Sequence, residues 1–174
     1  SAELEAYNQA NIWMDWEKQI TPTLSQSLKI MQDFEHIEVE VKAVETLQHA
    51  EKLIIELQKQ LQGFENIAVI TSFDLKIHQA LQQQNSSFKR GLLIEDDIQQ
   101  RAIKQALQLG CCQIGWMNQL ATDELIQATQ RADLDISVWT VNDIERAKHL
   151  RDLGINGLIT DFPKMMQLAL AQIQ

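Results

Sequence analysis

The sequence predicts an α/β fold built on a parallel β-sheet, and two observations support this. Short apolar runs rich in β-branched residues alternate with segments whose apolar residues recur every three or four positions. The apolar runs lack a polar face, which is typical of strands covered on both sides. Helical segments between successive strands favour parallel pairing with right-handed crossovers. We therefore expect one sheet with helices packed against it.

Six apolar runs are predicted to be strands, in the order 37–41, 67–71, 91–94, 111–117, 136–141 and 157–159. Four helices are predicted between or before them from apolar residues that share one face. These residues are Leu24, Leu28 and Met31, then Leu47, Ala50, Ile54, Leu57 and Leu61, then Ile98, Ala102, Ala106 and Leu109, then Ile144, Ala147 and Leu150.

Particular residues mark the helix boundaries. Thr21-Pro22-Thr23 predicts a helix start with Pro22 in the first turn. Asn142 followed by Glu145 has the spacing of a capping box. Three glycines each follow a helical pattern, where a left-handed residue ends a helix, namely Gly63, Gly110 and Gly154. Residues 1–19 show no strand, and Trp13 and Trp16 are candidate anchors against a neighbour.

Composition limits the class of partner. The chain has 174 residues, 45% of them hydrophobic, which is enough for one domain with its own core. It carries 15 basic and 24 acidic residues, a formal charge of -9. No segment gathers Lys and Arg, so nucleic acid is an improbable partner. No apolar run is long enough to span a membrane. The motifs GxGxxG and GxxxxGKS/T are absent, which argues against a nucleotide-binding fold.

The sulfur and imidazole side chains give little chemistry. Cys111 and Cys112 are adjacent on a predicted strand, so they point to opposite faces and are expected to be reduced. Reduced thiols favour a cytoplasmic location over export. None of the histidines follows a strand, and all four are expected on the surface without a role as general acid or base: His36, His49, His78 and His149.

The carboxyl ends of parallel strands are where active groups collect. After the first strand, alternation places Glu38, Glu40 and Lys42 on one side. A carboxylate beside a lysine suits a hard cation, Mg²⁺ or Ca²⁺, together with a phosphate whose charge the ammonium neutralises. Glu38 is nearer the start of the strand and is the less important carboxylate. The alternative is a solvated face on an edge strand.

Other strand ends offer substrate contacts. Ser72 has a hydroxyl to donate to an anion and Phe73 a ring to cover a polyol, although Ser72 or Asp74 as a helix N-cap is the alternative. Trp139 is either an apolar wall for the carbon face of a bound polyol or a plain core aromatic. Asp161 either caps the final helix or orients Lys42.

Six stretches along nearly the whole chain resemble the glycerophosphodiester phosphodiesterase family. Each is weak alone, but they occur in the right order and at the right distances. They are Thr21-Pro22-Thr23-Leu24, Glu40-Val41-Lys42, Thr71-Ser72-Phe73-Asp74, Arg90-Gly91-Leu92-Leu93, Val138-Trp139-Thr140-Val141-Asn142 and Gly157-Leu158-Ile159-Thr160-Asp161.

The resemblance implies that the fold is a (β/α)8 barrel of the TIM type. It also implies that the protein is a hydrolase of lipid and glycerol metabolism. It implies that glycerophosphodiesters are converted to glycerol 3-phosphate and an alcohol. Glu40 looks like a ligand of the family's divalent cation, and Lys42 like the residue that holds the phosphodiester. Trp139 and Phe73 look like parts of the substrate wall.

The family's opening histidine–arginine–glycine strand, its metal-binding glutamate and aspartate, and its second histidine have no counterpart here. We therefore expect residues 1–174 to form a single domain, an incomplete barrel without the N-terminal strands, which is inactive alone. We favour an N-terminal portion that precedes this sequence in the molecule. The alternatives are a reduced relative that pairs with itself or a partner, a non-catalytic binding or scaffold module, and a phosphate-binding barrel without hydrolysis.

Overall fold

The structure, a computed structural model, describes residues 17–18 and 20–171. The chain divides into two compact units, Ser1–Ile37 and Glu38–Gln174, and each is described by itself. Trp13 and Trp16 lie outside the described residues. The single domain expected over residues 1–174 stays a prediction.

In the first unit, helix α2 (Leu24–Ile30) begins after a capping box. The Thr23 hydroxyl accepts a hydrogen bond from the backbone N–H of Gln26, and the Gln26 side chain accepts one from the backbone N–H of Thr23. This reciprocal pair satisfies two amides at the helix start. The predicted start is therefore confirmed, but Pro22 precedes the cap instead of lying in the first turn.

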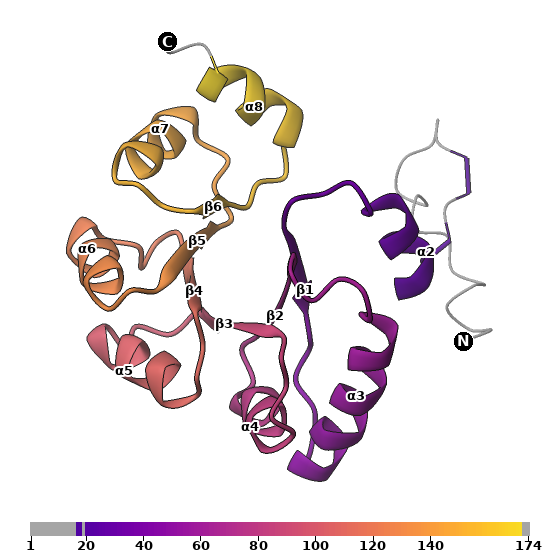
Figure 1. Ribbon diagram of the computed structural model, residues 1–174. Coiled ribbons are helices and arrows are strands. Elements are labelled where there is room, and N and C mark those ends of the chain that lie inside the picture. Colours follow the sequence, from indigo (N-terminus) through magenta and orange to yellow (C-terminus); the bar gives the residue numbers. More distant parts are fainter. Residues whose placement is uncertain (1–16, 19, 172–174) are drawn as a thin grey trace. The chain divides into compact units, whose positions relative to one another are not determined.

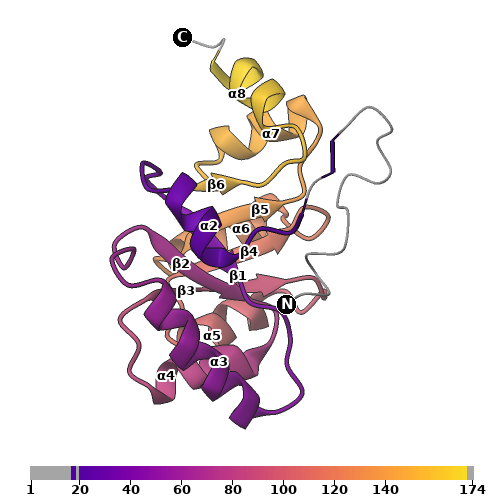
Figure 2. The same ribbon diagram turned by 90° about the vertical axis from the view of Figure 1, so that its right-hand side faces the viewer.

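The second unit is organised by a sheet of six strands whose spatial order is the chain order, β1 to β6. The registers from β2 through β6 are parallel, and a helix lies in each connection. Figure 1 shows the strands following a curve with α3 to α7 on its outer side, and Figure 2 shows them side by side. The bounds are β1 (Ile37–Glu40), α3 (Leu47–Gln60), β2 (Ala68–Ser72), α4 (Leu75–Gln83), β3 (Lys89–Ile94), α5 (Gln100–Gln108), β4 (Gln113–Met117), α6 (Asp123–Arg131), β5 (Asp135–Trp139), α7 (Ile144–Asp152), β6 (Gly157–Leu158) and α8 (Pro163–Ala171).

The core lies between the outer face of the sheet and these helices. Ile70, Ile114 and Ile136 are fully buried there, as is Trp116. The Trp116 indole donates a hydrogen bond to the Thr129 hydroxyl of α6 at 3.2 Å, so its one polar group is satisfied. Burial of the outer face of strands β2 to β5 holds the helices in place and leaves the inner face available for a functional site.

All six predicted strands are confirmed, with ends shifted by one or two residues. The apolar faces predicted for α3, α5 and α7 are confirmed as well, since Ile54, Ala106 and Ala147 are fully buried. Helix α6 was not predicted. Its buried face includes a threonine beside Leu125 and Ile126, and such a short, mixed face gives a weak 3.6-residue pattern.

The predicted cap of α7 is wrong by one residue. Asp143 is the N-cap, and its carboxylate accepts a hydrogen bond from the backbone N–H of Arg146 at 2.7 Å. Asn142 instead bonds to the end of β6, as described below. The helix-ending glycines are confirmed, because Gly63, Gly110 and Gly154 all have positive φ.

The expectation that every histidine is on the surface is wrong for His78, which is fully buried in α4. Its Nε2 lies 3.0 Å from the backbone oxygen of Ser72, and its Nδ1 lies 3.7 Å from Cys111 Sγ. A neutral imidazole with both nitrogens in contact tolerates burial better than a charged one. The two thiols are free, as expected, with Cys111 buried and Cys112 half-buried.

Candidate active site

The inner face of the sheet carries polar as well as apolar side chains, whereas the outer face is apolar. Gln113 on β4 donates from Nε2 to Glu38 Oε1 at 2.6 Å and to Ser137 Oγ at 3.1 Å. Strands β1 and β4 are three positions apart, which is about 14 Å in a flat sheet. The contact between Glu38 and Gln113 therefore requires the sheet to curl, and it spans the inside of the curve.

Glycines on the inner face make room for larger neighbours. A Cβ on Gly115 would lie 2.5 Å from Leu93 Cδ2, 3.1 Å from Ser137 Oγ and 3.6 Å from Trp139 Cδ1. A side chain at this position would therefore collide with the residues of the strands on either side. A glycine between Ile114 and Trp116, inside a strand, is the sequence signal for such a close approach.

Glu40 and Lys42 lie together at the carboxyl end of β1. Lys42 Nζ is 2.5 Å from Glu40 Oε1, which confirms that the two side chains project to the same side. The side chain of Glu40 is 36% exposed and that of Lys42 81% exposed. The Lys42 side chain is thus largely open to solvent, as the alternative of a solvated face on an edge strand predicts, whereas that of Glu40 is only partly exposed. Because β1 is an edge of the described sheet, it has a neighbouring strand on one side only.

Phe73 and Trp139 also meet on this side of the sheet, from strands β2 and β5. Their ring centroids are 5.4 Å apart and their planes are at 89°, an edge-to-face contact. The Trp139 indole donates to the backbone oxygen of Gly115 at 3.0 Å, which fixes the orientation of its ring. Both side chains are only half-buried, so this aromatic pair keeps a free surface.

Ser72 is not brought together with these groups. Its side chain is fully buried, and its hydroxyl donates to the backbone oxygen of Val41 at 2.7 Å. Of the two residues predicted as alternative N-caps, Ser72 and Asp74, it is Asp74 that caps α4. The Asp74 carboxylate also accepts a hydrogen bond from the backbone N–H of Val44 at 3.0 Å. Burial raises the pKa of the Asp74 carboxyl, but hydrogen bonds from Val44 and Lys76 outweigh it, so the pKa is lowered.

The ends of β5 and β6 are joined by a polar network. The Asn142 amide donates to Asp161 Oδ2 at 2.8 Å, and Asn142 Oδ1 accepts from the Asp161 backbone N–H and the Thr160 hydroxyl, each at 3.0 Å. Asp161 is thus engaged with Asn142 and is not paired with Lys42. This network follows Trp139 closely in the chain and holds the segment that carries the indole.

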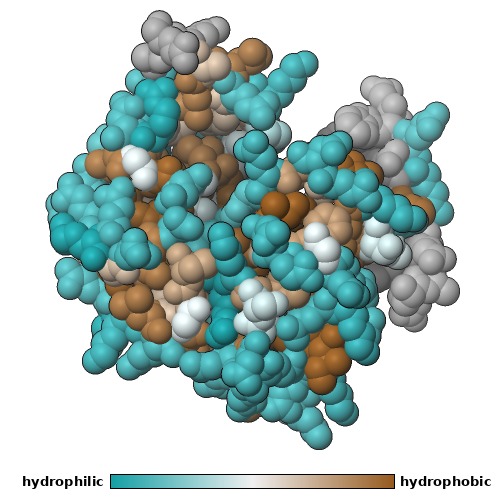
Figure 3. Space-filling model, in the orientation of Figure 1, coloured by the Kyte–Doolittle hydropathy of each residue, from teal (hydrophilic) through white to brown (hydrophobic). Residues whose placement is uncertain are grey.

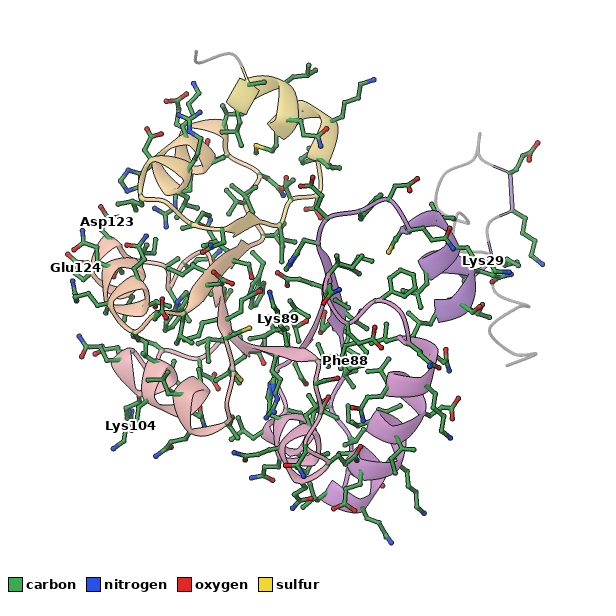
Figure 4. The ribbon with its side chains drawn as sticks, viewed as in Figure 1. Lys29, Phe88, Lys89, Lys104, Asp123 and Glu124 are labelled. Atoms are coloured by element: carbon green, nitrogen blue, oxygen red, sulfur yellow. The ribbon has the colours of Figure 1, made fainter. Side chains whose placement is uncertain are left out.

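Figure 4 separates inner from outer charged side chains. Lys89 lies on the inner side of β3, whereas Lys104, Asp123 and Glu124 lie on the outer helices. Lys89 is the first residue of its strand, so it is at the opposite end from Lys42. The space-filling view in Figure 3 shows hydrophilic and hydrophobic patches interspersed over the face of the molecule that is seen in Figure 1. The Glu40–Lys42 pair and the aromatic pair therefore define the candidate site.

The donor chemistry at Glu40 suits a hard divalent cation, because carboxylate oxygens are the ligands such ions prefer. One carboxylate is not a complete site. Within residues 17–18 and 20–171, no group of three His, Cys, Asp or Glu side chains is arranged to hold a metal ion. The described residues therefore do not form a complete cation site by themselves, and the role of Glu40 as a ligand stays a prediction.

The histidines of this part of the chain stay away from the strand ends that carry the site. His36 precedes β1, and the other three belong to helices: His49 to α3, His78 to α4 and His149 to α7. His149 pairs with Asp123 of α6 at 2.8 Å. Two inner-face residues, Gln113 and Ser137, were not identified from the sequence as part of the site's surroundings. The alternation of β4 and β5 is the only signal that places them there.

A curved parallel sheet with outer helices, and with a carboxylate–ammonium pair and two aromatics at its carboxyl end, is typical of the TIM-barrel class. The model of the glycerophosphoryl diester phosphodiesterase family matches residues 2–165. The chain belongs to this family. The fold and the family expected from the sequence are therefore confirmed, as is the class of enzyme, a phosphodiesterase for glycerophosphodiesters.

Solved structures agree on the fold. A glycerophosphodiester phosphodiesterase from Parabacteroides distasonis is similar at 16% identity and a TM-score of 0.81, with 99% of this chain and 71% of that chain covered. An Oleispira antarctica phosphodiesterase, solved with the product sn-glycerol-3-phosphate, is similar at 15% identity and a TM-score of 0.80, covering 98% and 70%. A putative glycerophosphoryl diester phosphodiesterase from Silicibacter pomeroyi has 18% identity and a TM-score of 0.75, covering 88% and 58%.

The comparison with curated proteins gave no match. The chain spans 58% to 71% of the three structures named above. Among the described residues, no helix combines the length and the apolar character needed to cross a membrane.

Proposed function

We propose that the protein hydrolyses glycerophosphodiesters to glycerol 3-phosphate and an alcohol with the help of a divalent cation, and that Glu40 and Lys42 serve this reaction. The observation that carries the proposal is their contact at 2.5 Å at the carboxyl end of β1, in a chain of the glycerophosphoryl diester phosphodiesterase family. In parallel α/β folds this end of the strands is where catalytic groups lie.

Each residue has a role that its chemistry suits. Glu40 would be one ligand of the cation, Mg²⁺ or Ca²⁺, which supplies Lewis-acid polarisation of the phosphoryl group when bound. The Lys42 ammonium neutralises a non-bridging oxygen of the phosphodiester. Phe73 and Trp139 present half-buried rings against which the carbon face of the glycerol packs.

Ser72 is left out of the substrate contacts in this proposal, because its hydroxyl donates to Val41. The cytoplasmic location stays a prediction, and so does self-association of the protein. The choice between Mg²⁺ and Ca²⁺ is a matter for titration.

The decisive experiment is an assay of the protein with glycerophosphocholine, in which glycerol 3-phosphate release is followed during titration with Mg²⁺ or Ca²⁺. Glu40→Gln should abolish the cation-dependent rate, and Lys42→Met should lower kcat/KM about 10²–10³-fold, the scale for loss of one charge-stabilising group. Glu56→Gln on α3 is the matched control, since Glu56 is exposed and far along the chain from the pair. An undiminished rate in Glu40→Gln contradicts the role of Glu40.

The second candidate is a binding module that holds the same class of ligand without turnover. It is favoured by the positions of the histidines in the described residues, none of which is at the carboxyl end of a strand. Calorimetry with glycerol 3-phosphate separates the two candidates. Binding that depends on Lys42, together with no hydrolysis at any cation concentration, supports the binding module.

A further inference from the structure

The backbone that carries Lys42 lacks regular structure. Strand β1 ends at Glu40, and residues 41–46 form neither helix nor strand before α3 begins at Leu47. The Lys42 side chain is 81% exposed, so packing against other side chains does little to fix it. The position of its ammonium must therefore depend on what holds the backbone on either side of it.

Ser72 holds the backbone just before Lys42. Its hydroxyl donates to the oxygen of Val41, which belongs to the peptide group joining Val41 to Lys42. Strand β2 adds a second bond to this residue, from the Val41 N–H to the oxygen of Thr71 at 2.8 Å. The Ser72 hydroxyl in turn accepts from the Asp74 N–H at 3.0 Å, so it both donates and accepts a hydrogen bond.

Asp74 holds the backbone just after Lys42. Its Oδ2 accepts from the N–H of Val44, and its Oδ1 accepts from the N–H of Lys76 at 2.9 Å and from the Lys76 ammonium at 3.0 Å. The Asp74 side chain is only 7% exposed. A nearly buried carboxylate with three donors is a rigid anchor, because none of its bonds can be replaced easily by water.

The residue between these two anchors points elsewhere. Phe73 reaches Trp139 on the far side of the site, while Ser72 and Asp74 bond to the segment after β1. A stretch of three residues at the end of β2 thus supports the aromatic pair and the lysine together. Figure 1 shows β1 and β2 side by side, which is why such short side chains suffice.

We propose that Ser72 and Asp74 are positioning residues that hold the backbone on both sides of Lys42 and so place its ammonium beside Glu40 and the phosphodiester. This inference rests on the proposed function for the phosphodiester, but the placement of Lys42 beside Glu40 is measurable without any turnover. Neither residue contacts the substrate, and each acts through the segment that it holds.

The first test measures the placement alone. The protein is acylated with an N-hydroxysuccinimide ester under limiting conditions, and the rate at each lysine is followed by peptide mass spectrometry. Lys42 should react more slowly than the exposed Lys104, because its contact with the Glu40 carboxylate hinders the approach of its nitrogen to the reagent. Ser72→Ala and Asp74→Ala should each raise the Lys42 rate several-fold, toward that of Glu40→Gln, in which the pair is broken.

Matched controls keep this test specific. Thr129→Val removes another buried hydroxyl, and Asp143→Ala removes another N-cap carboxylate, without touching the segment after β1. Both should leave the Lys42 rate unchanged. Thermal unfolding of every variant reports whether the fold is intact. A folded Ser72→Ala and a folded Asp74→Ala with the Lys42 rate of the unmodified protein overturn the proposal.

The second test uses turnover and a double-mutant cycle. Ser72→Ala and Asp74→Ala should lower kcat/KM by about 10–100-fold, the scale for residues that orient a ligand without touching the substrate. Asp74→Asn keeps an acceptor for Val44 and should recover part of the loss. In a Lys42→Met background the same changes should cost less than about twofold, because residues that act as a unit are not additive.

The outcomes separate this inference from the proposed function. If Ser72→Ala and Asp74→Ala lower kcat/KM as much in the Lys42→Met background as in the unmodified protein, the two residues have a general structural role and the positioning role is overturned. Absence of hydrolysis in the unmodified protein contradicts the proposed function, while the acylation rates still decide whether Ser72 and Asp74 place Lys42.

Discussion

Phe73 and Trp139 come from strands three positions apart, yet their rings meet edge to face at 5.4 Å. In a flat sheet the strands themselves would be about 14 Å apart. The contact therefore exists only because the sheet curls. It turns two separate strand ends into one continuous aromatic surface, at the same end of the sheet as the Glu40–Lys42 pair.

Trp139→Ala should raise KM for glycerophosphocholine about tenfold with a smaller effect on kcat. The reason is that a wall for the glycerol contacts substrate and transition state alike. Phe73→Ala should have the same sign and a smaller size. Steady-state kinetics checks both, with Phe64→Ala as the control, since Phe64 lies between α3 and β2 at the amino end of the sheet. A fall in kcat at constant KM would contradict the expectation that Trp139 contacts the substrate and the transition state equally.

Gly115→Ala should destabilise the protein by about 1–3 kcal/mol, the usual cost of overpacking a tight site. The new methyl group would meet Leu93 at 2.5 Å and press on Ser137. Urea unfolding measures the change. Gly157→Ala is the matched control, because the nearest atom to its added methyl is Ser137 Cβ at 3.3 Å. Gly157→Ala should cost less than Gly115→Ala, and an unchanged free energy of unfolding in Gly115→Ala would show that the crowding around Gly115 is relieved without cost.

The free energy of unfolding should fall as the pH drops below about 6.5, because of His78. Burial is the largest effect and lowers the pKa of the His78 imidazole from its ordinary value of 6.5. The hydrogen bond with the Ser72 backbone opposes it, the charge of Arg90 lowers the pKa further and that of Asp74 raises it, with a net decrease. The unfolded chain therefore takes up a proton at a higher pH than the folded one. Stability from the neutral imidazole is complete above 6.5 and is lost as the pH falls toward the folded-state pKa.

Urea titrations between pH 5 and pH 8, the range about the ordinary histidine pKa, measure this effect. His78→Gln keeps a donor toward the Ser72 oxygen and should flatten the profile in this range. His49→Gln on the exposed face of α3 should leave it unchanged. An identical slope in His78→Gln and the unmodified protein would rule out His78 as the source.

Cys112 should react with iodoacetamide well before Cys111 does. Burial raises the pKa of the Cys111 thiol to about 12, so almost no thiolate is present at neutral pH. Only 6% of Cys111 is exposed, whereas Cys112 is half-buried. Peptide mass spectrometry after brief labelling distinguishes the two, and labelling in urea should remove the difference. Faster reaction at Cys111 in the folded protein contradicts the burial described here.

The sequence predicted the strands well because each is a short apolar run with a glycine or a polar boundary. It predicted the common side of Glu40 and Lys42 from alternation alone. It did not predict the burial of His78, because the helical pattern of α4 is marked by few large apolar residues. Nor did it reveal that Ser72 and Asp74 bond to the segment after β1, since contacts across 30 or 31 residues leave no local pattern.

The hydrogen bond between Gln113 and Glu38 joins residues 75 positions apart, and this bears on how the protein assembles. Closing so long a loop has a large entropic cost, and contacts of this range form late when a chain folds. Strand β1 is synthesised first among the six, but its inner anchor on β4 appears only after three helical crossovers have been made. The segment that carries Glu40 and Lys42 is thus expected to reach its final place near the end of folding, when β4 is already in the sheet.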